Sequence, residues 1–451
     1  MPDALLRHPF MSQTALAECH DQAMVQAMLA FELALAEVQE AHGAMPQGAS
    51  AEMHRCLKSH AFDDTAIAAG IASGGNAAIP FVKQGRAALP DELKRYWHMG
   101  ATSQDVIDTA LMLLLKPRLA ALDALLLRCR AAAVELMKTH ERTVMVGRTL
   151  MQQALPMTFG VKVAHWAIGL EQARRRLAQV ELPVQFGGAV GVHSGLDEPG
   201  QDELGLDFMD ALAERLGLAA PVLPWHTNRQ PIHALGTALD AAAGAAEKLA
   251  LDISLLTQTE VGEVAEPSAP GMGESSSMPH KRNPVRCAMI RGATRQVHGY
   301  TTVLLNAAAQ PLERGLGEWH AEWSPLVDSA LLLEGALEQA ATLLEGLEVN
   351  PEAMRRNLAA TGGGIMAEPV SRLLAPVLGQ DAAKRISAEA AEMARLQGIP
   401  YAEALEAHAE VKAEVGGRLK VEVLHQATDP ALYLGSGQAQ LRRAMAWLQR
   451  E

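Results

Sequence analysis

Residues 271–284 are the part of this sequence that is richest in groups able to do chemistry, and they read GMGESSSMPHKRNP. Three adjacent serine hydroxyls are followed by two cations, Lys281 and Arg282, and by the amide of Asn283. Glycine, serine and proline at this density predict a loop between two helices. A cluster of donors that ends at a helix N-terminus is well suited to bind a carboxylate. An ordinary polar loop between helices is the alternative.

Two earlier segments carry further groups that suit anion binding. Residues 98–105 read HMGATSQD, and residues 147–160 read GRTLMQQALPMTFG. Hydroxyls and a guanidinium group in these segments can donate hydrogen bonds to a carboxylate. The alternative for Arg148 is a structural ion pair, and the alternative for His98 is an ordinary hydrogen bond inside the protein.

In this order, the three segments resemble the signature regions of the fumarase/aspartase superfamily, written H-x-G-x-T-S-x-D, G-R-T-H-x-x-x-A-x-P-x-T-x-G and G-S-S-x-M-P-x-K-x-N-P. Glu274 stands where the third region usually has a glycine. The resemblance implies an all-α, three-domain fold with a central bundle of long helices. It also implies a homotetramer whose active sites combine residues from three subunits, and an enzyme that needs no cofactor.

The resemblance also implies roles for individual residues. Ser275 is then the group that moves a proton at the carbon next to a substrate carboxylate, while Lys281 and Asn283 hold that carboxylate. The remaining substrate-binding residues are His98, Thr102, Ser103, Arg148, Thr149, Gln153 and Ser276. Such a proton transfer passes through an aci-carboxylate with two negative charges, and each preorganised donor lowers its energy by about 3–4 kcal/mol.

The sequence departs from the superfamily where many members have a histidine and a glutamate that together protonate a poor leaving group. The histidine position is Leu150 or, in the purine-nucleotide branch, Gln153, and the glutamate position is Ala288. Because both partners are missing, we expect a reaction whose entering or leaving group needs no proton. A carboxylate meets this condition, since its conjugate acid has a pKa of about 4.

Two further stretches resemble one branch of the superfamily, the prokaryotic 3-carboxymuconate cycloisomerases. They are residues 224–229, PWHTNR, and residues 313–323, ERGLGEWHAEW. Packing alone explains the aromatic residues of each stretch equally well. The branch implies conversion of 3-carboxy-cis,cis-muconate to 4-carboxymuconolactone, a step of protocatechuate degradation in the β-ketoadipate pathway. Arg314 is then a binding residue for the third carboxylate of this small tricarboxylate substrate, and Arg229 is a further candidate cation.

Two other functions stay open. One is a β-elimination of the adenylosuccinate- or argininosuccinate-lyase type, which the missing histidine and glutamate disfavour. The other is a catalytically silent helical scaffold, which the intact Ser275, Lys281 and Asn283 disfavour.

Long helices must position these segments. Apolar residues recur at helical spacing over residues 111–143, 152–182, 231–264 and 283–312. Helices of this length need neighbours that cover their apolar faces, and their broad alanine-rich faces predict an oligomer with one shared helical core. We expect an N-terminal helical domain at residues 1–110, a central bundle with the catalytic loop 268–284 at residues 111–346, and a small C-terminal helical domain at residues 347–451.

The composition argues against several other classes of protein. A formal net charge of −13 disfavours nucleic acid as a partner, and an anionic substrate then requires a few well-placed cations. No apolar run is long enough to predict a membrane span. Neither HExxH nor CxxC occurs, so we expect no metal. Four dispersed cysteines suit reduced thiols in the cytoplasm.

Overall fold

The computed structural model describes residues 9–194, 196, 203–268, 273, 278, 280–415 and 417–450, which are mostly helical. Four helices are long: α6 (Ser103–Thr139), α9 (Gln230–Leu256), α10 (Val285–Asn306) and α11 (Glu318–Glu345). The chain divides into two compact units, and each long helix has residues in both. Unit 1 comprises Met1–Leu125, Ala173–Glu247 and Met289–Glu338, and unit 2 comprises Leu126–Gln172, Lys248–Ala288 and Gln339–Glu451.

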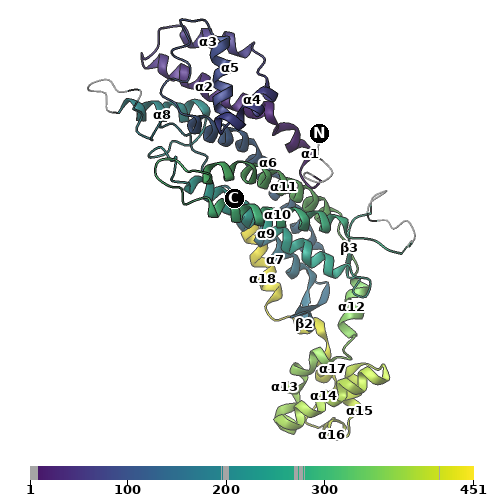
Figure 1. Cartoon of the computed structure of the whole chain (residues 1–451). Coiled ribbons are helices and arrows are strands. Elements are labelled where there is room, and N and C mark those ends of the chain that lie inside the picture. The colour runs from purple at the N-terminus through teal and green to yellow at the C-terminus, as the bar shows by residue number, and fades with distance from the viewer. Residues whose placement is uncertain are drawn as a thin grey trace. The chain divides into compact units, whose positions relative to one another are not determined.

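Short helices surround the start of α6 in unit 1 (Figure 1). They are α1 (Gln13–Glu18), α2 (Asp21–Ala41), α3 (Ala49–Lys58), α4 (Asp64–Gly74), α5 (Ala78–Ala88) and α8 (Leu204–Leu216). An aromatic row holds this part together, with ring centroids 5.0 Å apart for Phe62 and Phe81 and 6.1 Å apart for Phe81 and Trp97. Such contacts add to the stabilisation that comes from burying the rings.

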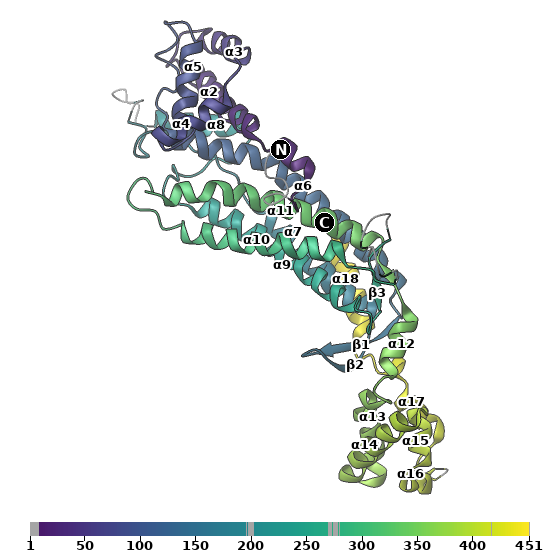
Figure 2. The ribbon, with the colours of Figure 1, turned by 45° about the vertical axis from the view of Figure 1, so that its right-hand side comes forward.

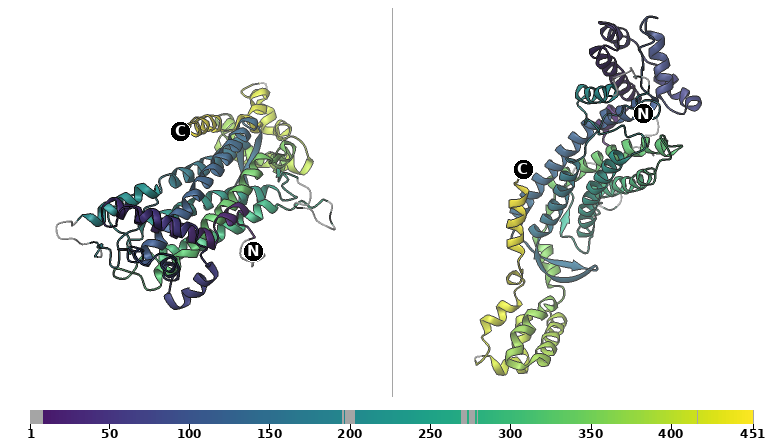
Figure 3. Two further views of the ribbon diagram at one scale, coloured as in Figure 1. Left: turned by 90° about the horizontal axis from the view of Figure 1, so that it is seen from above. Right: turned by 90° about the vertical axis from the view of Figure 1, so that its left-hand side faces the viewer.

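The long helices lie alongside one another within unit 1 (Figure 2 and Figure 3). An ion pair of 3.1 Å between Arg118 and Glu334 joins α6 to α11. A contact of 2.6 Å between His298 Nδ1 and Asp240 Oδ1 joins α10 to α9. The buried face of α9 is rich in alanine, whose small side chain lets neighbouring helices approach closely: Ala238, Ala242, Ala243, Ala246 and Ala250.

Unit 2 combines two strand pairs with a cluster of short helices (Figure 1). The antiparallel strands β1 (Val144–Thr149) and β2 (Gln152–Thr158) form a hairpin that leads into α7 (Phe159–Leu177), and β3 (Val264–Ala265) pairs with β4 (Glu348–Val349). The remaining elements are α12 (Pro351–Ala359), η1 (Gly364–Met366), α13 (Ala367–Leu378), α14 (Gln380–Gln397), α15 (Tyr401–Ala407), α16 (Ala409–Glu414), α17 (Val421–Thr428), η2 (Pro430–Leu432) and α18 (Gly437–Leu448). Val370, Ile386 and Leu405 lie in an apolar core that α13, α14 and α15 share.

The prediction of one helix over residues 152–182 is wrong at its start. Residues 152–158 form strand β2, and α7 begins only at Phe159. Pro156 pairs with Val146 where the register between the two strands shifts. Proline has no N–H group and disrupts a helix interior, whereas it fits an irregular hairpin. Thr158 Oγ1 then accepts the N–H of Val161 at 3.4 Å and helps to start the helix.

The other predicted long helices are present with shifted ends. α6 begins at Ser103 instead of residue 111 and contains Pro117, while α9 ends at Leu256 instead of residue 264. Two short strand pairs accompany the helices, and the mostly helical chain is consistent with the predicted all-α class. The three predicted domain boundaries stay a prediction. Within the described part of the chain, no helix is both long enough and apolar enough to cross a membrane.

Replacement of Gly85 on α5 tests the packing of unit 1. A Cβ atom at this position would lie 2.5 Å from Trp97 Cζ2, so we expect Gly85→Ala to destabilise the protein by about 1–3 kcal/mol, despite the better helix propensity of alanine. Trp97→Phe removes the ring atoms in question. The double variant should therefore lose less stability in thermal unfolding than the two single losses combined. Additive losses would contradict this packing.

Candidate active site

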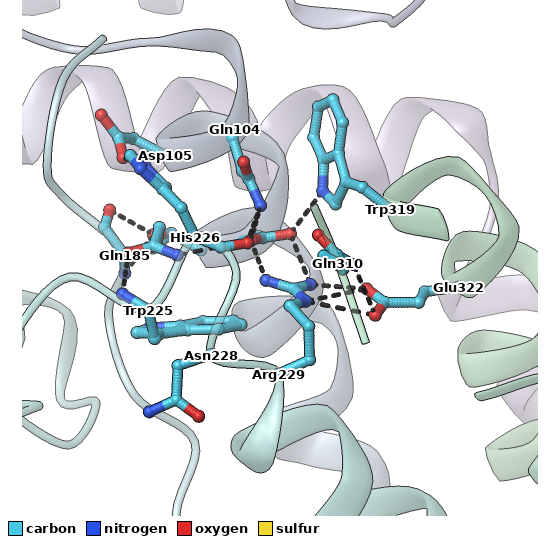
Figure 4. A network of polar contacts seen from close by, with 12 residues as sticks. Gln104, Asp105, Gln185, Trp225, His226, Asn228, Arg229, Gln310, Trp319 and Glu322 are labelled. Carbon is cyan, nitrogen blue, oxygen red and sulfur yellow. Dashed lines mark hydrogen bonds and ion pairs between the residues drawn. The ribbon is translucent and has the colours of Figure 1, made fainter. Parts of the chain in front are cut away.

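A buried ion cluster lies in unit 1, where three elements each supply one charged residue (Figure 4). Asp108 on α6, Arg229 directly before α9 and Glu322 on α11 are 0%, 2% and 1% exposed. The Arg229 guanidinium donates to Asp108 with Nη1–Oδ2 at 2.7 Å and Nη2–Oδ1 at 3.2 Å. It also donates to Glu322 with Nη2–Oε2 at 2.6 Å and Nε–Oε1 at 3.2 Å. Because removal of one partner would leave a buried charge uncompensated, the three residues depend on one another.

Uncharged donors complete the shell of this cluster. Trp319 Nε1 donates to Asp108 Oδ1 at 2.9 Å, and Gln310 Nε2 donates to Glu322 Oε1 at 3.1 Å. Burial raises the pKa of the Glu322 carboxyl, although hydrogen bonds from Arg229 and Gln310 oppose this shift. The cluster is thus a well-connected polar network inside an otherwise apolar bundle.

The geometry contradicts the expectation that Arg229 is a cation for the substrate. All three of its guanidinium nitrogens donate to carboxylates of the protein. The ring of Trp225 stacks against the guanidinium, with 4.7 Å between the ring centroid and Cζ. Arg229 therefore holds the structure together instead of presenting its charge to a ligand.

Two residues of the first predicted region fix the backbone around it. Asp105 Oδ2 accepts the N–H groups of Thr102 and Gly188, both at 2.9 Å, and Asp105 Oδ1 lies 2.7 Å from His226 Nε2. Gly188 has a positive φ of 70°, which glycine adopts at no steric cost. Gln104 Nε2 donates to the carbonyl of His226 at 2.8 Å. Segments far apart in the sequence thus meet at the first turn of α6.

Thr102 and Arg314 come together at this place. Arg314 donates from Nη1 to Thr102 Oγ1, from Nε to Gln104 Oε1 and from Nη2 to the carbonyl of Ala189, each at 3.1 Å. All three acceptors are uncharged. Arg314 is partly exposed and makes no ion pair with a carboxylate among the described residues. Three predicted substrate-binding residues therefore lie together at the start of α6: Thr102, Ser103 and Arg314. No carboxylate of the described residues neutralises the charge of Arg314.

His98 forms an ion pair with a buried glutamate. Its Nδ1 lies 2.5 Å from Glu32 Oε1, and Glu32 is 1% exposed. Burial lowers the pKa of His98, but the nearby Glu32 carboxylate more than offsets this and leaves the pKa above its usual value. The Glu32 carboxylate thus favours the protonated form of His98 and compensates its charge.

The second predicted region forms the hairpin of unit 2. Arg148 on β1 donates to Glu263 with Nη2–Oε1 at 2.7 Å and Nη1–Oε2 at 3.0 Å, and Asn357 on α12 donates to Glu263 Oε1 at 2.8 Å. The bidentate geometry and the burial of Glu263 correspond to the structural ion pair that was the alternative for Arg148. Arg148 therefore has little charge to offer a ligand in this structure.

The tip of the hairpin is apolar and exposed. Leu150 and Met151 have positive φ angles of 48° and 66° and are 97% and 68% exposed. Thr149 beside them is exposed as well, while Gln153 is partly buried and its Oε1 has no hydrogen-bond partner among the described residues. The hairpin thus places Thr149 and Gln153 beside an exposed apolar tip.

Of the third predicted region, Ser275 and Ser276 lie outside the described residues. Lys281 is exposed and makes no ion pair within the described ranges, and the N–H of Asn283 donates to the carbonyl of Gly273 at 2.9 Å. Arg282 donates to both carboxylate oxygens of Glu348 at 2.9 Å. Lys281, but not Arg282, thus has its charge available.

The N-terminus of α10 is already occupied. Glu266 accepts the N–H of Arg286 at 3.0 Å and the N–H of Cys287 at 2.8 Å, one with each carboxylate oxygen. A carboxylate is favoured at this end of the helix dipole. The N–H groups of Arg286 and Cys287 are therefore not free for a ligand, whereas binding of a substrate carboxylate by Lys281 and Asn283 stays a prediction.

The sequence reasoning missed the acidic partners Asp108 and Glu322 and the linking role of Gln104. One signal was available. Gln104, Asp105 and Asp108 are polar positions at the start of α6, in a stretch where Val106, Ile107, Ala110 and Leu111 are apolar. Polar side chains on the inner face of a buried helix require partners, so these three residues indicated a polar network.

The ion pair of His98 predicts a pH dependence of stability. Because its pKa in the folded protein exceeds the ordinary 6.5, the pair stabilises the fold fully below pH 6.5 and less as the pH rises through the raised pKa. His98→Asn keeps a residue that tolerates its φ of 61° but removes the titrating group. The stability advantage of the unsubstituted protein over this variant, measured as Tm, should shrink as the pH rises above 6.5. Glu32→Gln serves as the control and should weaken the same dependence. An advantage that is constant across this range would contradict the ion pair.

Comparison with known proteins places this geometry in a family. Residues 13–299 match a family model described as lyase. The chain is 41% identical over 443 residues to a 3-carboxy-cis,cis-muconate cycloisomerase from Pseudomonas aeruginosa, an alignment that covers 97% of this chain and 95% of the relative. It is also 40% identical to a nitrosuccinate lyase from Streptomyces davaonensis, over 95% of this chain and 91% of the relative. The crystal structure of a 3-carboxy-cis,cis-muconate lactonizing enzyme from Pseudomonas putida matches with a TM-score of 0.90 and 38% identity, over 99% of both chains. The chain belongs to this lyase family, the fumarase/aspartase superfamily.

Proposed function

We propose that this protein is a cycloisomerase that converts 3-carboxy-cis,cis-muconate to 4-carboxymuconolactone. The full-length similarity to relatives of that name supports this reaction. The structural observation that best supports this reaction is the set of partners of Arg314. Its guanidinium donates only to uncharged acceptors among the described residues, so its positive charge is available to a ligand. A substrate with three carboxylates needs such a cation in a protein of net charge −13.

The reaction adds a carboxylate of the substrate across a double bond and takes up one proton, which Ser275 transfers and recovers from solvent, so the trianionic substrate becomes a dianionic lactone. One carboxylate oxygen forms a bond to a carbon of the double bond, and the π electrons move toward the carboxylate beyond the neighbouring carbon. The resulting aci-carboxylate is bound by Lys281 and Asn283, and Ser275 delivers a proton to the carbon. Donors aimed at the developing charge lower the barrier because they need no reorganisation during the reaction.

The binding residues complete this scheme. Thr102 and Ser103 bind a second carboxylate, and Arg314 binds the third. Their position at the N-terminus of α6 supports this assignment, because hydroxyl groups and a helix dipole both favour an anion there. His98, Arg148, Thr149, Gln153 and Ser276 line the remainder of the pocket in this proposal, with Arg148 acting mainly through its ion pair with Glu263.

The absence of a histidine at the tip of the hairpin fits the entering group. Leu150 is fully exposed at the position where the superfamily has its proton-donating histidine, and Ala288 replaces the glutamate. The attacking carboxylate is already deprotonated at neutral pH, since its conjugate acid has a pKa of about 4. No residue has to protonate or deprotonate the oxygen that forms the lactone.

The active protein in this proposal is a cytoplasmic homotetramer in which three subunits contribute to each site. Large apolar side chains that are exposed on the single chain support an assembly that covers them: Leu150, Met151, Val222, Leu223, Leu312 and Leu316. Exposed apolar residues at this density mark surfaces for association.

A second candidate reaction is the elimination of nitrite from nitrosuccinate. The relative named nitrosuccinate lyase, at 40% identity, favours it. Nitrite is the anion of a fairly strong acid and leaves without a proton, so the missing histidine and glutamate do not exclude it. Nitrosuccinate has two carboxylates, however, and leaves none for Arg314.

The first test is a spectrophotometric assay with the purified protein. We expect loss of the diene absorbance of 3-carboxy-cis,cis-muconate, and much slower turnover of nitrosuccinate. Ser275→Ala should abolish turnover while size-exclusion chromatography shows an unchanged assembly, and Ser277→Ala is the matched control that should retain activity. Near-normal kcat in Ser275→Ala would remove Ser275 from the mechanism, and preference for nitrosuccinate would favour the second reaction.

A second test restores the missing proton donor. The double substitution Leu150→His with Ala288→Glu should not raise kcat for lactone formation, because the attacking carboxylate needs no proton transfer. Each single substitution serves as the control for effects on assembly. A large gain in the lactonising rate of the double variant would show that the oxygen does require proton transfer.

A further inference from the structure

The amide of Gln104 is the only described side chain that contacts both the buried cluster and Arg314. Gln104 is fully buried, and its Nε2 donates to Asp108 Oδ2 at 3.2 Å and to the carbonyl of His226 at 2.8 Å. Its Oε1 accepts the Nε–H of Arg314 at 3.1 Å. Figure 4 shows the Gln104 side chain pointing into the network formed by His226, Arg229 and Trp319.

We propose that Gln104 is a positioning residue that aims Arg314 at the third carboxylate of the substrate and thereby sets the selectivity for tricarboxylates. This inference rests on the proposed function and extends the structural role of Gln104 to the selection of the substrate. Gln104 acts through Arg314 and does not touch the substrate itself.

The orientation of the amide is determined by its partners. An amide group offers two N–H donors on one side and an acceptor oxygen on the other. Asp108 and the carbonyl of His226 can only accept, so they fix the NH₂ group on their side. The oxygen must then face Arg314, which can only donate. A flipped amide would oppose like groups at all three contacts, so the buried cluster dictates which group Arg314 meets.

The amide also separates two charges that would otherwise attract each other. Asp108, Arg229 and Glu322 together carry a net charge of one negative unit when both carboxylates are ionised. A direct pair between Asp108 and Arg314 would neutralise Arg314, as Glu263 neutralises Arg148 in unit 2. The uncharged Gln104 fixes Arg314 with a hydrogen bond and leaves its charge in place.

Arg314 retains donors for a ligand in this arrangement. A guanidinium group has five N–H groups, and three of them donate to Gln104, Thr102 and Ala189. The other two have no acceptor among the described residues. A carboxylate can form charge-assisted hydrogen bonds with such a partly exposed arginine. Its binding free energy is more favourable because the arginine is already oriented before the ligand binds.

The experiment compares Gln104→Met with the unsubstituted protein. Methionine has a similar length but makes no hydrogen bonds to Asp108 or Arg314. The readout is selectivity, expressed as kcat/KM for 3-carboxy-cis,cis-muconate divided by kcat/KM for cis,cis-muconate, which lacks the third carboxylate. We expect this ratio to fall about tenfold, the effect of one lost hydrogen bond to a charged group. Arg314→Met should remove the preference, and Gln104→Met should cause no further loss in the Arg314→Met background.

Two further variants separate positioning from stability. Gln310→Met removes a hydrogen bond to Glu322 in the same network but none to Arg314, so it should change Tm without changing the ratio. Gln104→Glu keeps the shape of the side chain and adds a charge that pairs with Arg314, so it should also lower the ratio. Because its oxygens would also face Asp108 and the His226 carbonyl, which only accept, the ratio is compared only for variants whose Tm shows a folded protein.

A binding measurement distinguishes failure of this inference from failure of the proposed reaction. Calorimetric titration with tricarballylate and with glutarate gives a selectivity for the extra carboxylate without any turnover. We expect this binding ratio to fall in Gln104→Met and Gln104→Glu and to stay constant in Gln310→Met. A ratio that both Gln104 variants leave unchanged, or losses that add to those of Arg314→Met, would overturn the positioning role. A protein that binds tricarballylate selectively but converts neither muconate would overturn the proposed reaction alone.

Discussion

The buried ion pairs of Arg229 with Asp108 and Glu322 are the interactions that position the start of α6 in the candidate site. Arg229 lies 121 positions from Asp108 and 93 positions from Glu322 along the chain. In the fold the three side chains meet, and each residue is at most 2% exposed. Loss of any one member would leave a buried charge without compensation, which typically costs about 3–5 kcal/mol. The requirement fixes the register of α6 against α11 and the point at which the chain enters α9. The first turn of α6, with Thr102 and Ser103, is placed by the same contacts.

Arg148, Arg229 and Arg314 differ in their hydrogen-bond acceptors, and the type of acceptor determines whether an arginine's charge is neutralised. Arg229 and Arg148 face carboxylates and serve structure. Arg314 faces an amide, a hydroxyl and a carbonyl, so its hydrogen bonds restrict its motion without cancelling its charge. In a chain of net charge −13, neutral acceptors leave the charge of Arg314 available to an anionic ligand. The residue type alone does not reveal which arginine has this property.

The sequence predicted the long helices and the segments that gather around Thr102 and Arg314, because helical periodicity and local motifs extend over neighbouring residues. It did not predict β2, since Gln152 to Leu155 have no clear period and Pro156 was read within a helical pattern. It also assigned Arg229 to the substrate, and it did not reveal that Glu266 accepts the first N–H groups of α10. Glu322 and Glu266 lie 93 and 20 positions from these partners, and one sequence does not show which residues pair. Burial decides which polar groups must pair, and burial emerges only with the fold.

The left-handed backbone at the hairpin tip sets folding and association against each other at one residue. Histidine, asparagine and aspartate adopt positive φ more readily than leucine, so the backbone at Leu150 would accept the superfamily's histidine with less strain. Leu150 is also 97% exposed, so its own chain does not bury the apolar side chain. A neighbouring molecule that covered the tip would offset both costs, whereas the isolated hairpin gains no stability from the leucine.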